Sequence, residues 1–226
     1  MATNQKKQAE STPWTWPANA KLALSVVVNV EEGSEYTLAD GDKITEPVDE
    51  LNVVLKKPLR NYGNESNYRY GINEGHARIA ALLDKYRVSA TYTAAALALE
   101  RAPNVAAYIK ARKHEACCLG YRWVHQFGLD EEREREFILK GLNSIEKSTG
   151  VRPVGWLSRY LHTDVTRRLL VEEGFTYHMD DYSGDMPFWD VVETTAGPKP
   201  MVITPYAIDT NDMKMWVAPA MQPWDW

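Results

Sequence analysis

The residues best suited to chemistry lie in short polar clusters, each directly after an apolar stretch. Glu31 and Glu32 follow the first apolar stretch, and Asp180 and Asp181 follow a later one. Two carboxylates held close together raise each other's pKa, which suits one of them to general acid–base catalysis. Such pairs also occur as helix caps and as solvated loop charges, and the sequence leaves the two interpretations balanced.

A different cluster, HEACCLGYRW at residues 114–123, combines a histidine, a carboxylate, two adjacent cysteines and an arginine. A cysteine nucleophile needs a base within reach, and His125 is the one candidate close in sequence. Free cysteines more often pack as small apolar side chains, and a lone histidine beside a glutamate is more often structural. We therefore expect Cys117 and Cys118 to lie in the core.

The apolar pattern predicts a scaffold in which strands and helices alternate. Strands are expected at 21–30, 88–93, 114 onward, 151–157, 175–179 and 201–205, and helices at 73–87, 94–99, 104–113, 130–150 and 163–173. Residues 34–70 lack periodicity and are expected to form a long loop. Alternation of this kind indicates an α/β fold with a parallel sheet, open or closed into a barrel.

Ligands bind at the carboxyl ends of parallel strands, so the polar clusters are expected to share one rim. The side chains expected there also include Arg152, Trp156 and Arg159, Tyr182, Asp185 and Trp189, and Tyr206, Asp209, Asn211 and Asp212. For Arg152 the alternative is a simple ion pair with a loop carboxylate.

Composition limits the class of protein. The net charge of −5 argues against a nucleic-acid partner, and the longest apolar run, 22–30, is too short to cross a membrane. There is no apolar leader, and two adjacent cysteines make no disulfide framework, so we expect a cytoplasmic protein. Eight Trp and twelve Tyr suggest a lined pocket or a homo-oligomer contact. Residues 1–20 are expected to form an N-terminal arm, and 21–226 one catalytic domain.

Six motifs occur in one order along the chain: NVEEG (29–33), SATYT (89–93), HEACCLGYRW (114–123), RPVGW (152–156), DDYSGDMPFW (180–189) and PYAIDTNDM (205–213). In this order they resemble the NodB-like polysaccharide deacetylase superfamily, and most closely its metal-independent branch of allantoinases and cyclic imide hydrolases. The resemblance implies a distorted, partly open (β/α) barrel, here without its last helix and strand. It also implies hydrolysis of C–N bonds other than peptide bonds.

The resemblance also marks where this chain departs from the family. Metal-dependent members use an aspartate pair on the first strand, replaced here by Glu31 and Glu32, and two histidines, replaced here by Leu119 and Trp123. Neither leucine nor tryptophan serves as a zinc ligand, so we expect no metal. The metal-independent branch shares the tryptophan but keeps a histidine where this chain has Leu119.

The roles that the resemblance implies are those of a small-molecule hydrolase. Glu31 is the expected base, and Glu32 holds a substrate N–H or tunes Glu31. Arg152 or backbone N–H groups at 119–122 stabilise the oxyanion, and Asp180 orients the arginine. The pocket is expected to be lined by Cys118, Leu119, Trp123, Trp156, Tyr182, Trp189 and Tyr206.

Three functions stay open at this point. The first is ring opening of a cyclic amide such as allantoin or an imide, weakened by the loss of a histidine at Leu119. The second is a non-catalytic or weakly active homologue that retained its ligand pocket. The third is a metal-dependent polysaccharide N-deacetylase, which the missing ligands disfavour.

Overall fold

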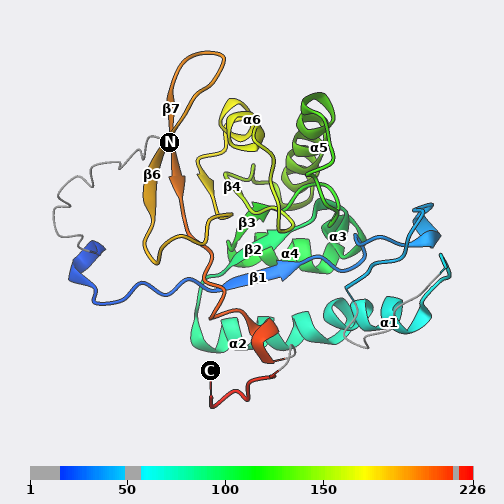
Figure 1. The fold of residues 1–226 in the computed structure, drawn as a ribbon. Helices are drawn as coiled ribbons and strands as arrows, with labels where there is room; N and C mark the ends of the chain where they lie inside the picture. The colour runs from blue at the N-terminus through cyan, green and yellow to red at the C-terminus, as the bar shows by residue number, and fades with distance from the viewer. Residues whose placement is uncertain (1–15, 49–56, 216–218, 226) are drawn as a thin grey trace.

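Seven strands form one sheet in the computed structural model, which describes residues 16–48, 57–215 and 219–225. The sheet order is β1-β2-β3-β4-β5-β7-β6 (Figure 1). The strands are β1 (Val27–Val30), β2 (Thr91–Ala94), β3 (Glu115–Cys118), β4 (Gly155–Trp156), β5 (Tyr177–His178), β6 (Phe188–Val192) and β7 (Lys199–Ile203). This α/β architecture confirms the predicted alternation of strands and helices.

Neighbouring strands from β1 to β5, and then β7, run parallel, and each connection from β1 to β5 contains at least one helix. Val27 lies opposite Thr91, and Thr91 lies opposite Glu115. β6 pairs antiparallel with β7. Within the described residues β1 and β6 have a partner on one side only, so the sheet is not closed. The expected open edge is therefore present.

The helices cover the sheet from outside. They are α1 (Tyr62–Tyr70), α2 (His76–Tyr86), α3 (Ala96–Arg101), α4 (Pro103–Arg112), α5 (Glu131–Thr149) and α6 (Thr166–Glu172), with short 3-10 segments at Pro17–Asn19, Leu38–Asp40 and Asp212–Met215. Figure 1 shows α5 and α6 along one side of the sheet and α2 beyond its β1 end. None of the helices in the described ranges is both long and apolar enough to span a bilayer.

Helix α5 shows how local sequence sets these elements. The side chain of Asp130 accepts a hydrogen bond from the backbone N–H of Arg133, and Gly150 ends the helix in the left-handed conformation. Ile138, Leu142 and Ile145 are fully buried, which forms the apolar stripe that their spacing predicts. Both ends of the helix were predicted from the sequence.

The first strand begins at Val27 and not at residue 21 as predicted, and two further elements differ from the predictions. Residues 62–70, expected to be loop, form α1, which Asn61 caps by accepting a hydrogen bond from the N–H of Asn64. α1 continues through a π-helical segment, Gly71–Gly75, into α2. Most of α1 is exposed, so its sequence has no apolar stripe from which a helix could be predicted. The second difference is β6, an edge strand that pairs only with β7.

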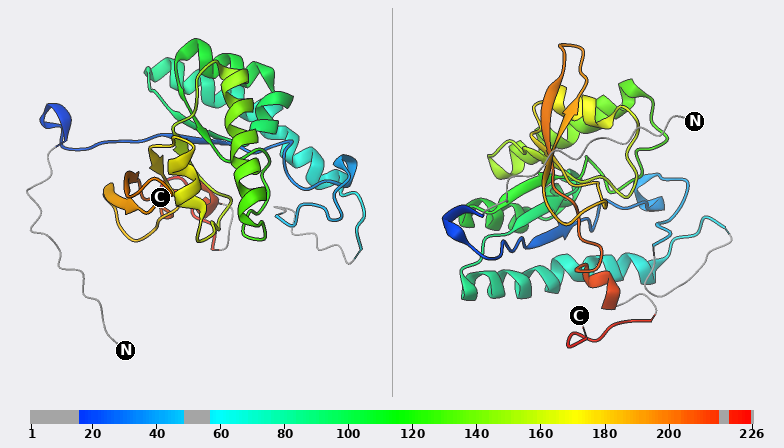
Figure 2. Two further views of the ribbon diagram at one scale, coloured as in Figure 1. Left: turned by 90° about the horizontal axis from the view of Figure 1, so that it is seen from above. Right: turned by 60° about the vertical axis from the view of Figure 1, so that its left-hand side comes forward.

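The two ends of the described chain lie on the open side of the sheet. Figure 2 shows the segment that leads into β1 extending away from the helices, and Leu22 and Leu24 there are exposed. The 3-10 helix Asp212–Met215 lies beside the rod formed by α1 and α2 (Figure 1). Residues 1–15 of the expected N-terminal arm lie outside the described ranges.

Candidate functional site

The glutamate pair follows the last residue of β1 and opens a tight turn. The backbone N–H of Ser34 donates to the carbonyl of Glu31 at 3.1 Å, and Gly33 adopts a φ of 83°. The carboxylate of Glu32 folds back and accepts the N–H of Glu31 at 3.1 Å. The two side chains therefore differ in their contacts. The carboxylate of Glu32 is hydrogen-bonded to the backbone of the turn, whereas the carboxylate of Glu31 has no such bond within the described residues.

Glu31 is the most strongly perturbed acid at this edge of the sheet. Burial raises its pKa from 4.5 to about 8, and the negative charge of Glu32 adds to the shift. The guanidinium of Arg159 opposes the shift, whereas the carboxylates of Glu46 and Asp212 strengthen it. Glu31 still keeps part of its surface open to solvent. It is thus a carboxyl group that can both take up and release a proton near neutral pH.

Arg159 and Glu46 form a buried ion pair beside Glu31. The two terminal nitrogens of Arg159 donate to the Glu46 carboxylate at 2.9 and 2.5 Å, and the side chains are 1% and 2% exposed. Arg159 also donates to the carbonyl oxygen of Trp123 at 2.8 Å, and its guanidinium carbon lies 3.7 Å from the centre of the Trp123 ring. The pair fixes the ring of Trp123 next to the catalytic candidates.

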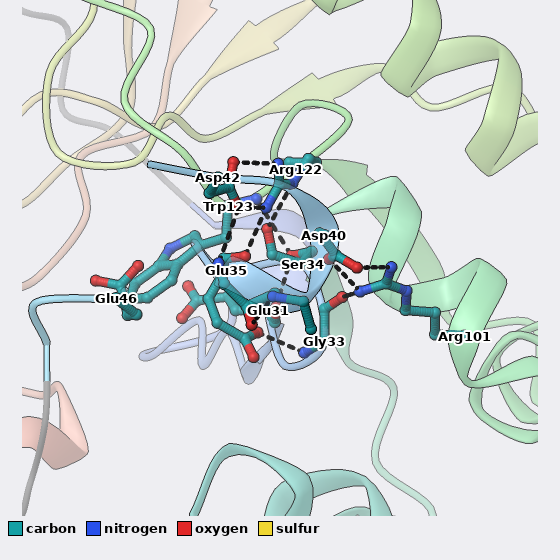
Figure 3. Close-up of polar contacts among 12 residues, drawn as sticks. Glu31, Gly33, Ser34, Glu35, Asp40, Asp42, Glu46, Arg101, Arg122 and Trp123 are labelled. Carbon is teal, nitrogen blue, oxygen red and sulfur yellow. Dashed lines mark hydrogen bonds and ion pairs between the residues drawn. The ribbon is translucent and has the colours of Figure 1, made fainter. Parts of the chain in front are cut away.

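Two further arginines fasten the segment 34–48 around this site. Arg122 binds Asp42 through both terminal nitrogens, at 3.0 and 2.6 Å, and Arg101 binds Asp40 in the same way at 2.8 Å. Figure 3 shows this segment folded around Glu31 with both arginines at its outer side. Bidentate arginine–carboxylate pairs give geometric definition to a stretch that has little regular secondary structure.

A cavity of about 1240 Å³ opens next to the glutamates, between β7 and the segment that leads into β1. Glu32, Tyr206 and Asp212 line its polar end, and Asn211 donates to the Tyr206 hydroxyl at 3.0 Å. Burial raises the pKa of Tyr206, so its phenol stays protonated. Trp189 also lines the cavity. The space is large enough for a drug-sized molecule or an oligosaccharide unit.

Of the expected site residues, Glu32, Trp189 and Tyr206 line the cavity, whereas Glu31 and Trp123 lie together beside segment 34–48 (Figure 3). Tyr182 is half exposed and lies close enough to Tyr206 for their charges to interact. Several other expected residues lie elsewhere.

Arg152 is not part of this region. It precedes β4, at the amino end of the strand, where it donates to the carbonyl oxygen of Glu173 at 2.9 Å and lies 3.6 Å from Glu146. Arg159, which follows the carboxyl end of β4, occupies the place expected for Arg152. The sequence contains both arginines within eight residues, and only the exact span of the strand separates them.

Asp180 does not orient an arginine in the described structure. It is buried, accepts the backbone N–H of Ser158 at 2.7 Å and pairs with the buried His178. Asp181, by contrast, binds Arg167 at 3.3 Å. Asp180 thus holds the loop that carries Arg159 in place and makes no direct contact with it.

Three expected lining residues belong to the core. Trp156 is fully buried and donates through its indole nitrogen to Ser158 at 2.8 Å. Leu119 is 2% exposed, and its N–H binds the carbonyl oxygen of Ala94 at 2.9 Å. Burial raises the pKa of the Cys118 thiol to about 12, so it is no thiolate nucleophile at neutral pH.

The donor set at the positions of the family's metal site does not fit a metal ion. Leu119 and Trp123 offer no ligand atom, and one carboxylate oxygen of Glu32 already accepts a backbone N–H. Across the described ranges, no group of three or more His, Cys, Asp or Glu side chains is placed to hold a metal. A three-ligand zinc site cannot be assembled from these residues as they stand.

The chain is similar to known polysaccharide deacetylases. The family model for polysaccharide deacetylases matches residues 66–178. A Schizosaccharomyces pombe protein named as a polysaccharide deacetylase is 31% identical over 97% of this chain and 72% of its own length.

Two solved structures are similar to this chain over most of its length. The crystal structure of Puue allantoinase has a TM-score of 0.85 and 38% identity, covering 93% of this chain and 70% of that one. A Pseudomonas aeruginosa PAO1 protein named as a polysaccharide deacetylase has a TM-score of 0.83 and 38% identity, covering 91% of this chain and 69% of its own.

Proposed function

The chain belongs to the polysaccharide deacetylase family, and we propose that it hydrolyses a C–N bond by opening the ring of a cyclic amide without a metal ion. The observation that carries this proposal is Glu31, a carboxyl group with a pKa near 8 directly before Glu32, which lines the cavity. Such a group can activate water at neutral pH, a task that zinc performs in metal-dependent hydrolases.

The proposed reaction uses Glu31 twice. Its carboxylate removes a proton from water while the water oxygen forms a bond to the amide carbon. The tetrahedral intermediate then breaks its C–N bond, and the leaving nitrogen takes that same proton from the Glu31 carboxylic acid. The products are a ring-opened carboxylic acid and a free N–H, so the proton count balances and Glu31 returns to its starting state.

Two neighbouring side chains, Tyr206 and Glu32, can form hydrogen bonds with a cyclic amide. The Tyr206 hydroxyl accepts a hydrogen bond from Asn211 and also contacts the Asn29 side chain, and in the proposed reaction it turns its own proton to the developing oxyanion. Glu32 has a second carboxylate oxygen that can accept a substrate N–H, because its Oε2 is bound to the backbone of Glu31. A cyclic amide with a ring N–H offers both the acceptor and the donor that these side chains require.

The likeness to Puue allantoinase, at 38% identity over 93% of this chain, supports this choice of substrate class. A second function has an observation in its favour. Leu119 fills, in the core, the position where the resemblance leads us to expect a histidine. A ligand-binding homologue that lost its chemistry would tolerate that change, whereas it would gain nothing from a buried, perturbed Glu31.

The test is hydrolysis of allantoin, hydantoins and cyclic imides by the wild type, Glu31→Gln and Leu119→His. Ring opening by the wild type that is lost in Glu31→Gln supports the proposal. A gain in Leu119→His indicates that the missing histidine limits the rate. Absence of ring opening in the wild type and in Leu119→His, at any pH from 6 to 9, contradicts it and favours the binding homologue.

A further inference from the structure

We propose that the floor of the cavity, formed by Thr91, Glu115 and Tyr177, is a second binding site, in which the Glu115 carboxylate holds a positively charged group of the substrate. The inference rests on the proposed function and narrows its substrate class: the cyclic amide carries an alkyl chain that ends in an ammonium group. Glu115 belongs to the polar cluster at residues 114–123, and the reaction proposed above does not use it.

The floor is built by strands that lie next to one another in the sheet, from β2 to β5. Thr91 begins β2, Glu115 lies opposite it on β3, and Tyr177 begins β5. The Thr91 hydroxyl donates to one oxygen of the Glu115 carboxylate at 2.7 Å, and the Tyr177 hydroxyl donates to the other at 2.9 Å. These two bonds fix the orientation of the carboxylate, and all three side chains line the cavity.

Strand β4 contributes to the floor by lacking a side chain at Gly155. This glycine lies opposite Tyr177, and a Cβ added to it would lie 1.9 Å from the Tyr177 ring and 2.2 Å from the hydroxyl oxygen. Gly155 therefore leaves the space through which the phenol reaches Glu115. Burial raises the pKa of Tyr177, so the phenol stays protonated and remains a hydrogen-bond donor.

The charge of the cavity favours a cation. The described residues that line it include no lysine, arginine or histidine, but they include four carboxylates, those of Glu32, Glu115, Asp185 and Asp212. Both donors to Glu115 are neutral hydroxyls, so they orient its carboxylate without balancing its charge. Charges held away from bulk water are normally paired. A cationic group on the ligand supplies such a partner, and the other carboxylates attract it into the cavity.

A separate group in the same cavity also points to a ligand. The hydroxyl of Thr204 lines the cavity and is shielded from water, and no atom of the described residues forms a hydrogen bond with it. Buried polar groups without a partner are rare in proteins. Thr204 directly follows β7, at the rim end of the cavity. A ligand that extends from the rim to the floor can therefore bind both Thr204 and Glu115.

The depth of the cavity sets the length of that ligand. Thr91 lies opposite Val27, the first residue of β1, and the strand ends at Val30. At about 3.3 Å per residue, the floor lies about 10 Å from the carboxyl end of β1. The ring of a cyclic amide bound at the rim is too short to span this depth alone, whereas a ring with an aminobutyl chain reaches the floor.

The walls of the cavity select the kind of cation. Much of the lining is apolar and includes Leu24, Met179 and Val202, which suits an alkyl chain. A bare metal ion is a poorer match, because calcium and magnesium need about six or more oxygen ligands. The floor offers one carboxylate, and its two hydroxyls already donate to that carboxylate. An ammonium group on a carbon chain therefore fits best.

The experiment measures ligand binding to Glu31→Gln by calorimetry, so that the result does not depend on hydrolysis. The probes are two hydantoins that carry either an aminobutyl or a pentyl chain on the same ring carbon, which differ in charge and hardly in size. We expect the aminobutyl compound to bind at least about tenfold more tightly, because a hydrogen bond to a charged group contributes this much. The preference should shrink as salt is added.

Glu115→Gln, introduced into Glu31→Gln, should reduce the preference to about twofold or less, because the amide keeps the size of the side chain and removes its charge. The matched control is Asp185→Asn in the same background, which removes one exposed carboxylate of the lining and leaves the floor intact. It should keep the preference within about twofold of its starting value. Tyr177→Phe keeps the charge of Glu115 and removes one bond that orients it, so it should reduce the preference by a smaller factor.

Equal affinity of the two hydantoins for Glu31→Gln overturns the inference without reference to any floor variant. A preference that survives Glu115→Gln, or that falls equally in Asp185→Asn, overturns it as well. If the wild type opens both rings with equal kcat/KM, the proposed function stands and this inference fails. If the aminobutyl compound binds selectively through Glu115 and the wild type never opens its ring, the cation site stands and the proposed function fails.

Discussion

The pH dependence of hydrolysis is the most demanding consequence of the site. With a pKa of about 8, Glu31 is ionised in about one molecule in eleven at pH 7 and in about ten in eleven at pH 9. If the carboxylate is the base, kcat/KM should rise about tenfold over these two units. A glutamate at its ordinary value of 4.5 would instead give a flat profile over the same range.

The assay is ring opening of a cyclic amide, followed at substrate concentrations below KM so that the profile reports on the free enzyme. Glu31→Gln should lower kcat/KM by ~10²–10⁴-fold and abolish the limb near pH 8, because the amide side chain cannot take up a proton. A flat profile from pH 6 to 9, or a limb that persists unchanged in Glu31→Gln, would refute the assignment of Glu31 as the base.

Three other outcomes follow from the same contacts. Gly71→Ala should abolish activity without loss of stability, because the added Cβ would lie 1.9 Å from the Glu32 carboxylate. The control Gly75→Ala, whose added Cβ would have no neighbour closer than 3.8 Å, should stay active. Equal activity in the two variants would show that the position of Glu32 is unimportant. Arg152→Ala should leave kcat/KM within about twofold of the wild type, since its contacts lie at the other end of the sheet; a large loss would return it to the site. Glu31→Gln should have a higher urea midpoint than the wild type at pH 8 and the same midpoint near pH 4.5. The reason is that the pKa of Glu31 is raised in the folded state, so the wild type loses stability as the pH rises above the unfolded value. If variant and wild type had the same midpoint at both pH values, burial would not disfavour the ionised form of Glu31.

The sequence predicted the framework of the fold because each long element carries its own signal. α5 has an aspartate cap, an apolar stripe and a terminal glycine, and all three perform as expected. β1 is a mostly β-branched run that ends at Val30, directly before Glu31, so the sequence placed the glutamate pair at the end of the strand. These signals are local, and they depend on the order of residues within one turn or one strand.

The parts that were missed depend on contacts across the chain. The pairing of Glu46 with Arg159 joins residues 113 positions apart, and no pattern in either segment specifies it. The choice between Arg152 and Arg159 depends on where β4 begins, and β4 is only two residues long. β6 has an exposed, irregular apolar pattern, and the turn that joins it to β7, with Gly197 at a φ of 97°, is the one local sign of a hairpin.

The most direct test of the central claim is to measure ring opening of a cyclic amide by protein dialysed against a strong chelator, before and after zinc is added. The proposed mechanism predicts the same rate in both samples, with loss of that rate in Glu31→Gln. A rate that appears only with zinc, or release of acetate from an N-acetyl sugar in place of ring opening, would contradict it.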